Sequence, residues 1–163
     1  MAKPTTYATP ICIVLSILVI IGIVWGYLDK SPLIISLFLL PAVGYEAYRT
    51  EGVSTRWASW VMVVVLLAEL VAILFNFKFD LASYFGASET FFFGYSLPLG
   101  DIKIIFPIVM IILSFILFFR TIGKYTKWLA VLIFFSAIAI VYVIDPGILK
   151  SLLHMGRYGG YYF

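Results

Sequence analysis

Apolar residues along this chain gather into five long blocks, separated by short segments that carry charges, prolines or glycines. The blocks lack the strict alternation of a membrane β-barrel strand, and their lengths fit helices that cross a hydrocarbon core of about 30 Å at about 1.5 Å per residue. We therefore predict an all-α integral membrane protein that forms a single membrane domain over residues 1–163, as a bundle of five transmembrane helices. The predicted spans are 11–28, 32–48, 57–77, 104–119 and 128–144.

The second block is the weakest of the five. Pro32 suits the first turn of a helix, whereas Pro41 lies inside the block and is expected to kink it. The block is also short. Two interpretations stay open, a short kinked span and a re-entrant helix.

Composition supports the membrane assignment and excludes several other classes. The 163 residues are 64% hydrophobic and 12% charged, with a mean hydropathy of +1.12, whereas a soluble domain averages about 45–50% apolar and about 25% charged. Disordered chains and nucleic-acid-binding modules do not have this composition. One cysteine, Cys12, and one histidine, His154, allow neither an internal disulfide nor a Cys/His metal site. We expect no metal, no intrinsic cofactor and no nucleic-acid partner, but we do expect bound lipid.

Charge is distributed unevenly between the two sides of the predicted bundle. The side with the N-terminus and the loops 49–56 and 120–127 carries six basic residues against two acidic ones, Glu46 and Glu51. The opposite side carries five of each sign. Because Lys and Arg in short loops favour the cytoplasmic side, we predict a plasma or inner membrane protein with a cytoplasmic N-terminus and an extracytoplasmic C-terminus.

Glu69 is the sharpest candidate for function, because it lies well inside the third predicted span. A carboxylate at that depth costs a few kcal/mol unless it is paired, hydrated or protonated. Helical spacing puts it on a stripe of small and polar residues that favours contact with protein: Ala58, Met62, Glu69, Ala72 and Asn76. Two interpretations stay open. Glu69 joins its helix to a neighbour, or it carries a proton or binds a cation with Asn76 as hydrogen-bond partner.

Small residues mark further positions where helices can approach closely. Gly22 and Gly26 form a G-x-x-x-G pattern in the first span, which suits packing within the chain or against another subunit. Ser136 and Ala139 give the fifth span a comparable small face.

Aromatic residues are concentrated in the segment from Lys78 to Asp101 and in the C-terminal tail, 145–163. Apolar surface of this extent marks an interface, so we expect the segment between the third and fourth spans to lie on the outer leaflet or against another subunit. The alternative is that the rings rest in the head-group layer. The candidate contacts are Tyr84, Phe85, Phe91, Phe92, Phe93, Tyr95, Tyr158, Tyr161, Tyr162 and Phe163.

Sequence motifs predict no catalytic residue, since no phosphate loop, HExxH or GxSxG pattern is present. No internal repeat is visible either, which disfavours an inverted-repeat transporter. The favoured hypothesis is a non-catalytic accessory subunit that binds other subunits of a membrane complex, of the energy-converting or respiratory kind. Two alternatives stay open: a small transporter or ion-conducting protein that uses Glu69, and a lipid-binding or lipid-modifying membrane protein.

Overall fold

The computed structural model describes residues 7–76, 90–92, 95–97 and 102–147. Two three-residue strands, β1 (Thr90–Phe92) and β2 (Tyr95–Leu97), pair antiparallel in the segment that was predicted as an aromatic loop. The five predicted helical blocks are confirmed as helices. Their bounds are α1 Ala8–Leu28, α2 Pro32–Arg49, α3 Val53–Leu74, α5 Ile102–Arg120 and α6 Lys124–Ile144.

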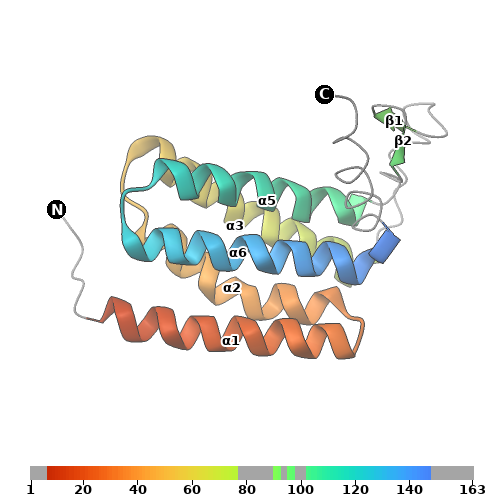
Figure 1. Cartoon of the computed structure of the whole chain (residues 1–163), viewed down its shortest axis with the longest axis horizontal. Helices are drawn as coiled ribbons and strands as arrows, with labels where there is room; N and C mark the ends of the chain where they lie inside the picture. Colours follow the sequence, from red (N-terminus) through yellow and green to blue (C-terminus); the bar gives the residue numbers. More distant parts are fainter. Residues whose placement is uncertain (1–6, 77–89, 93–94, 98–101, 148–163) are drawn as a thin grey trace, which may run out of the picture.

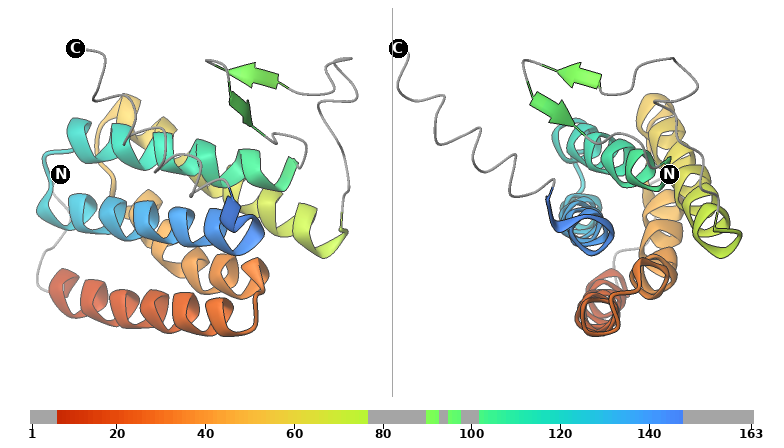
Figure 2. Two further views of the ribbon diagram at one scale, coloured as in Figure 1. Left: turned by 45° about the vertical axis from the view of Figure 1, so that its right-hand side comes forward. Right: turned by 90° about the vertical axis from the view of Figure 1, so that its right-hand side faces the viewer.

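The five helices run alternately up and down and form a bundle of two layers. α1, α6 and α5 make up one layer, and α2 and α3 make up the other (Figures 1 and 2). α2 contacts α1, α3 and α6, while α6 contacts α1, α2 and α5. These two helices are therefore the most enclosed, and most of the buried residues gather around them.

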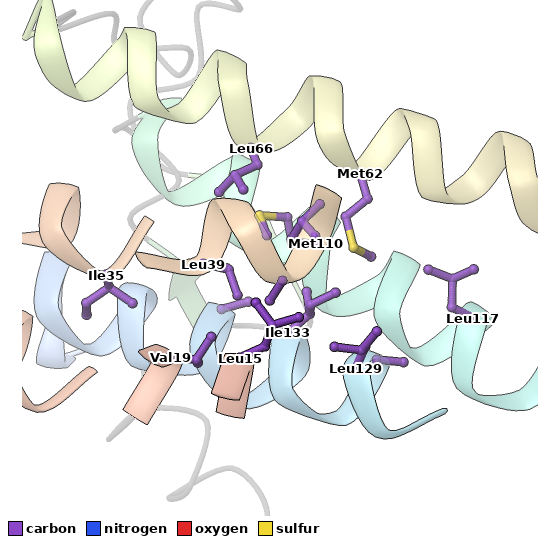
Figure 3. Close-up of a cluster of buried hydrophobic side chains, with 14 of the residues drawn as sticks. Leu15, Val19, Ile35, Leu39, Met62, Leu66, Met110, Leu117, Leu129 and Ile133 are labelled. Carbon is purple, nitrogen blue, oxygen red and sulfur yellow. The ribbon is translucent and has the colours of Figure 1, made fainter. Parts of the chain in front are cut away.

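One apolar core holds the bundle together, with side chains from every helix. Leu15, Leu39, Met62, Met110 and Ile133 come from α1, α2, α3, α5 and α6 respectively, and all are buried in the same cluster (Figure 3). Between packed helices in a membrane, such side chains contribute through close contact rather than through exclusion of water. The core therefore defines which face of each helix points inward.

Four helices in the described part of the chain are long and apolar enough to cross a membrane: α1, α3, α5 and α6. α2 is absent from this set because Ser36, Pro41, Glu46 and Arg49 make it more polar. It is nevertheless a continuous helix through Pro41, and it runs antiparallel to α1 and α3 (Figure 1). The chain is thus a membrane-embedded helical protein.

Seven of the ten helix boundaries differ from the prediction by one to four residues, including the start of α3, which lies at Val53 instead of residue 57. α3 ends at Leu74 instead of residue 77, because Asn76 has a φ of +48°, in the left-handed region where helices terminate. α1 already begins at Ala8, since Pro10 fits in a first turn whose amides need no helical acceptor. α6 begins at Lys124, one turn before the predicted residue 128.

The glycine pattern of α1 packs within the chain. A Cβ added to Gly22 would overlap Cβ of Phe38, and one added to Gly26 would overlap Cγ1 of Ile35, both on α2. Both glycines are buried. The sequence leaves two interpretations open, packing within the chain and packing against another subunit. The structure shows the first, since both glycines contact α2 of the same chain.

The other predicted packing residues also lie on inward faces. Met62 and Ser136 have no exposed surface, and Ala72 is buried. Ala58 and Ala139 are half-buried and pack against the core cluster.

Most of the predicted aromatic contacts fall outside the described residues: Tyr84, Phe85, Phe93, Tyr158, Tyr161, Tyr162 and Phe163. Phe91 and Phe92 belong to β1, and Tyr95 belongs to β2. The interface that these residues were predicted to form therefore stays a prediction.

Candidate functional site

The α2–α3 hairpin contains a reciprocal pair of buried carboxyl groups. Ser36 and Glu46 stand ten residues apart on α2, and Ser59 and Glu69 stand ten residues apart on α3. Ser36 Oγ donates to Glu69 Oε1 at 3.3 Å, and Ser59 Oγ donates to Glu46 Oε1 at 3.0 Å. Each helix therefore gives one serine and one glutamate, and the two pairs are related by an approximate two-fold axis between antiparallel helices.

Residue spacing explains why these side chains meet. Steps of three and four residues keep a row of side chains on one helix face, which is the pattern by which two helices pack along their length. All ten residues of the two rows are at most 7% exposed. The rows are Ser36, Leu39, Val43, Glu46 and Thr50 on α2 and its end, and Thr55, Ser59, Met62, Leu66 and Glu69 on α3.

Glu46 lies in the more polar of the two sites. Thr50 Oγ1 donates to Glu46 Oε1 at 2.5 Å, in addition to the bond from Ser59. The same Thr50 hydroxyl is 2.9 Å from the backbone oxygen of Glu46, and the Ser59 hydroxyl is 3.0 Å from that of Thr55. Each hydroxyl thus has a carboxyl and a helix carbonyl within reach.

Glu69 has one hydroxyl partner of the same kind. Besides Glu69 Oε1, the hydroxyl of Ser36 reaches the backbone oxygen of Pro32 at 3.1 Å. Glu69 has no exposed surface.

These hydroxyls can serve a carboxyl group in either protonation state. A hydroxyl has one proton to donate and can also accept, so it donates to an ionised carboxylate. When the carboxyl is protonated, the hydroxyl turns toward the helix carbonyl and accepts the acid proton. Rotation about one side-chain bond is enough, so the backbone need not move. The arrangement can therefore bind and release a proton at Glu46 and at Glu69.

The second oxygen of each carboxyl is unsatisfied. Glu46 Oε2 and Glu69 Oε2 are buried and have no hydrogen-bond partner in the described part of the chain. Such atoms are rare in folded proteins, and each calls for an explanation. A carboxyl group with hydroxyl partners alone, in an apolar interior, is held as the neutral acid or needs a cation. The pair therefore has the chemistry of a protonatable site.

Apolar side chains separate the two carboxyls. Glu46 lies level with Ser59, and Glu69 is ten residues further along α3, which corresponds to about 15 Å. The rows between them contain no polar side chain: Leu39, Val43, Met62 and Leu66. Figure 3 shows Met62 and Leu66 pointing from α3 into the core beside Leu39. The hairpin therefore holds two separate sites.

The partner predicted for Glu69 is wrong. Asn76 lies beyond the end of α3, where it is exposed, and its Oδ1 accepts a hydrogen bond from Lys103 Nζ at 2.7 Å. The left-handed conformation of Asn76 takes it off the helical stripe that the sequence predicts. Ser36 is the residue that contacts Glu69, and it had no part in the prediction.

Glu46 is the functional candidate that sequence reasoning missed. The charge count places it among the loop charges of the side with the N-terminus; the structure puts it near that end, but inside the hairpin and with no exposed surface. A signal was present, because a serine precedes a glutamate by ten residues in two successive blocks.

The described residues contain no cluster of three or more histidine, cysteine, aspartate or glutamate side chains that could hold a metal ion. Cys12 is buried in the apolar core. Comparisons with family models, with curated proteins and with solved structures find no match for this chain. Inference about function therefore starts from the hairpin itself.

Proposed function

We propose that the chain crosses the membrane five times, with α2 as one of the spans. Its 18 residues correspond to about 27 Å, close to the thickness of a hydrocarbon core. The polar face of α2 is buried against α3, and the opposite face suits contact with lipid. The exposed residues of α2 are Leu37, Leu40, Pro41, Gly44 and Tyr48.

Orientation follows from charge at the helix ends. One end of the bundle, where α1, α3 and α6 begin, carries a basic group: Arg49, Arg56, Arg120, Lys124 and Lys127. We call this the basic end. The positive-inside rule favours its placement in the cytoplasm of a cell membrane, which also puts the N-terminus there and the C-terminus outside.

We infer that the protein takes up and releases protons at Glu69, as a small transporter or proton-conducting protein. The observation that carries this proposal is the buried, unpartnered Oε2 of Glu69, whose other oxygen is held by Ser36. A neutral amide would hold two helices together equally well, without the free-energy cost of a carboxyl group in an apolar interior. Hard metal cations need about six to eight oxygen ligands, which favours a proton as the bound species.

Proton flux into liposomes tests this function. The purified protein is reconstituted, a membrane potential is imposed with potassium and valinomycin, and the internal pH is followed with a dye. Glu69→Gln keeps the shape and the serine bond but removes the exchangeable proton, so the flux should fall to the level of protein-free vesicles. Glu51→Gln, at an exposed position, is the matched control and should conduct as the wild type does. Unchanged flux in Glu69→Gln would contradict the proposal.

A second function, an accessory subunit of a larger membrane complex, is favoured by the outer surface of α6. An apolar groove of about 360 Å³ separates α6 from α1, and another of about 240 Å³ separates it from α5. Phe135, which is 59% exposed, lines both. Side chains of another helix can pack into the grooves on either side of such a ridge.

Site-specific photocrosslinking in the native membrane tests the second function. A crosslinker at position 135 should capture stoichiometric partner subunits, and one at Leu67, exposed on α3, should not. Native mass spectrometry of the extracted protein should show the same partners. A monomer that carries only lipid would contradict the subunit proposal and would instead favour the lipid-binding alternative.

A further inference from the structure

We propose that Glu46 is a second proton site, which exchanges protons with the basic end of the bundle, while Glu69 exchanges protons with the opposite end. The inference rests on the proposed function and adds to it a second residue and a direction. It follows from the two-fold relation within the α2–α3 hairpin, since this relation places equivalent carboxyls toward opposite sides of the membrane.

The position of each glutamate along its helix supports the two directions. Glu46 lies three residues before Arg49, the last residue of α2, or about 5 Å from the basic end. Glu69 lies five residues before Leu74, the last residue of α3, or about 8 Å from the opposite end. Because α2 and α3 run antiparallel, these helix ends lie on opposite sides of the bundle (Figure 1).

The apolar rows between the sites make direct exchange slow. Proton transfer needs groups within about 3 Å of each other, or a single bridging water. The two carboxyls are about 15 Å apart along α3, with only Leu39, Val43, Met62 and Leu66 from the two rows between them. Exchange with its own end requires water to enter over about 5 Å for Glu46 and about 8 Å for Glu69, which is a shorter path than the one between the two sites. Passage from one site to the other requires the two helices to separate or to admit water.

The described ionisable groups on the surrounding helices form no hydrogen bond with Glu46 or Glu69, whose partners are hydroxyl groups. Near Glu46, the guanidinium of Arg49 lies 4.7 Å from the ring centre of Tyr125 on α6 and donates to Tyr45 Oη at 3.4 Å. Near the other end, Lys103 of α5 donates to Asn76. The remaining ionisable groups on α1, α3, α5 and α6 that are described are Cys12, Tyr27, Arg56, Arg120, Lys124, Lys127 and Tyr142. No member of this set is a hydrogen-bond partner of either carboxyl.

The chemical step is a simple acid–base exchange. A carboxylate oxygen takes a proton from hydronium, which leaves water and the neutral acid, and on release the proton returns to water as hydronium. The carboxyl gains or loses only the proton, with no change in oxidation state. The hydroxyls of Thr50 and Ser59 at one site, and of Ser36 at the other, switch between carboxyl and carbonyl as the proton arrives and leaves.

Side-specific labelling tests the inference. Dicyclohexylcarbodiimide, which enters membranes and reacts with protonated carboxyls, is added to sealed proteoliposomes of known orientation, and the labelled residue is identified by peptide mass spectrometry. Glu69→Gln is used to follow Glu46, and Glu46→Gln to follow Glu69, so that each variant has one site and keeps the imposed pH gradient. Acidifying the compartment at the basic end should raise labelling of Glu46, and acidifying the other compartment should raise labelling of Glu69.

Several outcomes separate this inference from the proposed function. Labelling of both residues from the same side, or labelling of Glu46 that ignores pH, would overturn the two-site inference. Loss of flux in Glu69→Gln with full flux in Glu46→Gln would also overturn it, while the proposed function would stand. Side-specific labelling with unchanged flux in both variants would support the two sites and contradict the proposed function. If Glu46→Gln does not fold, by circular dichroism in detergent, wild-type protein labelled within seconds of a pH jump gives the same comparison.

Discussion

The α2–α3 and α5–α6 hairpins are both pairs of antiparallel helices, yet they use their buried hydroxyl groups differently. In α5–α6, Ser114 Oγ donates to the backbone oxygen of Ile111 at 2.8 Å, and Ser136 Oγ donates to that of Leu132 at 2.7 Å. Each of these bonds stays within one helix. In α2–α3, the hydroxyls also reach carboxyl groups on the opposite helix.

The difference shows that hydrogen bonds between the helices hold one pair in register, whereas the buried serines of the other pair bond within their own helices. A shift of α3 along α2 by one turn would break both serine–glutamate bonds and leave the Glu69 carboxyl without its hydroxyl partner in an apolar interior, which is unfavourable. A shift of α5 along α6 would leave the serine bonds intact, because they move with their own helix. Carboxyl groups therefore fix the register of the first hairpin as well as supplying protonatable groups.

A carboxyl group introduced into the α5–α6 hairpin should be poorly tolerated. This prediction is the strongest test of the comparison. Ile133 on α6 has no exposed surface and lies in the apolar core. Ile133→Glu should lower the free energy of unfolding by about 3 kcal/mol, since the carboxyl would enter the apolar core cluster. Reversible unfolding in mixed micelles measures the change. Ile133→Val, with an expected loss of about 1 kcal/mol in the free energy of unfolding, is the control for a change in side-chain volume without a charge. Wild-type stability in Ile133→Glu would contradict the distinction.

Substitution of single serines should affect the stability of the two hairpins differently. Ser59→Ala removes a bond between helices and should lower the free energy of unfolding by about 1 kcal/mol. Ser114→Ala, equally buried, removes only a bond within a helix and should change it by less than about 0.5 kcal/mol. The same micelle assay compares them. Equal losses for the two alanine variants would argue against a special role for the α2–α3 hydroxyls.

Replacement of a carboxyl by an apolar side chain should have little effect on stability and a large effect on function. Glu69→Met fills a similar volume and removes a buried polar group, so stability should stay within about 1 kcal/mol of the wild type or rise. Proton flux should be lost in the same variant. Measuring stability and proton flux on one preparation distinguishes a carboxyl that is needed for proton exchange from one that is needed for packing between helices. A marked loss of stability would favour adhesion.

Sequence alone locates the helices well because each apolar block must satisfy its backbone hydrogen bonds internally and so forms a helix within a membrane. The starts of α1, α3 and α6 differ from the prediction by three, four and four residues, and the end of α3 differs by three. Gly22 and Gly26 are recognised as packing positions from their spacing. Their neighbours on α2 are not, because the choice of neighbouring helix depends on the whole bundle.

The candidate site is predicted only in part, for a similar reason. Glu69 stands out because a charge inside a long apolar block is rare. Glu46 does not, since it lies near the end of its block beside Arg49, where a charge is ordinary. Only the pairing of α2 with α3 identifies its buried face and brings Ser59 beside it. The missing information is therefore the register between two helices, which no single block contains.

The apolar rows between Glu46 and Glu69 also have an electrical consequence. The two rows place the carboxyls about 15 Å apart along the membrane normal, which is about half of a hydrocarbon core, so roughly half of the membrane voltage should drop between them. A proton that passes from the level of one carboxyl to that of the other would gain or lose about 1 kcal/mol for each 100 mV across the membrane. If the proposed proton exchange occurs, the distance spanned by Leu39, Val43, Met62 and Leu66 would determine how strongly the membrane voltage drives it.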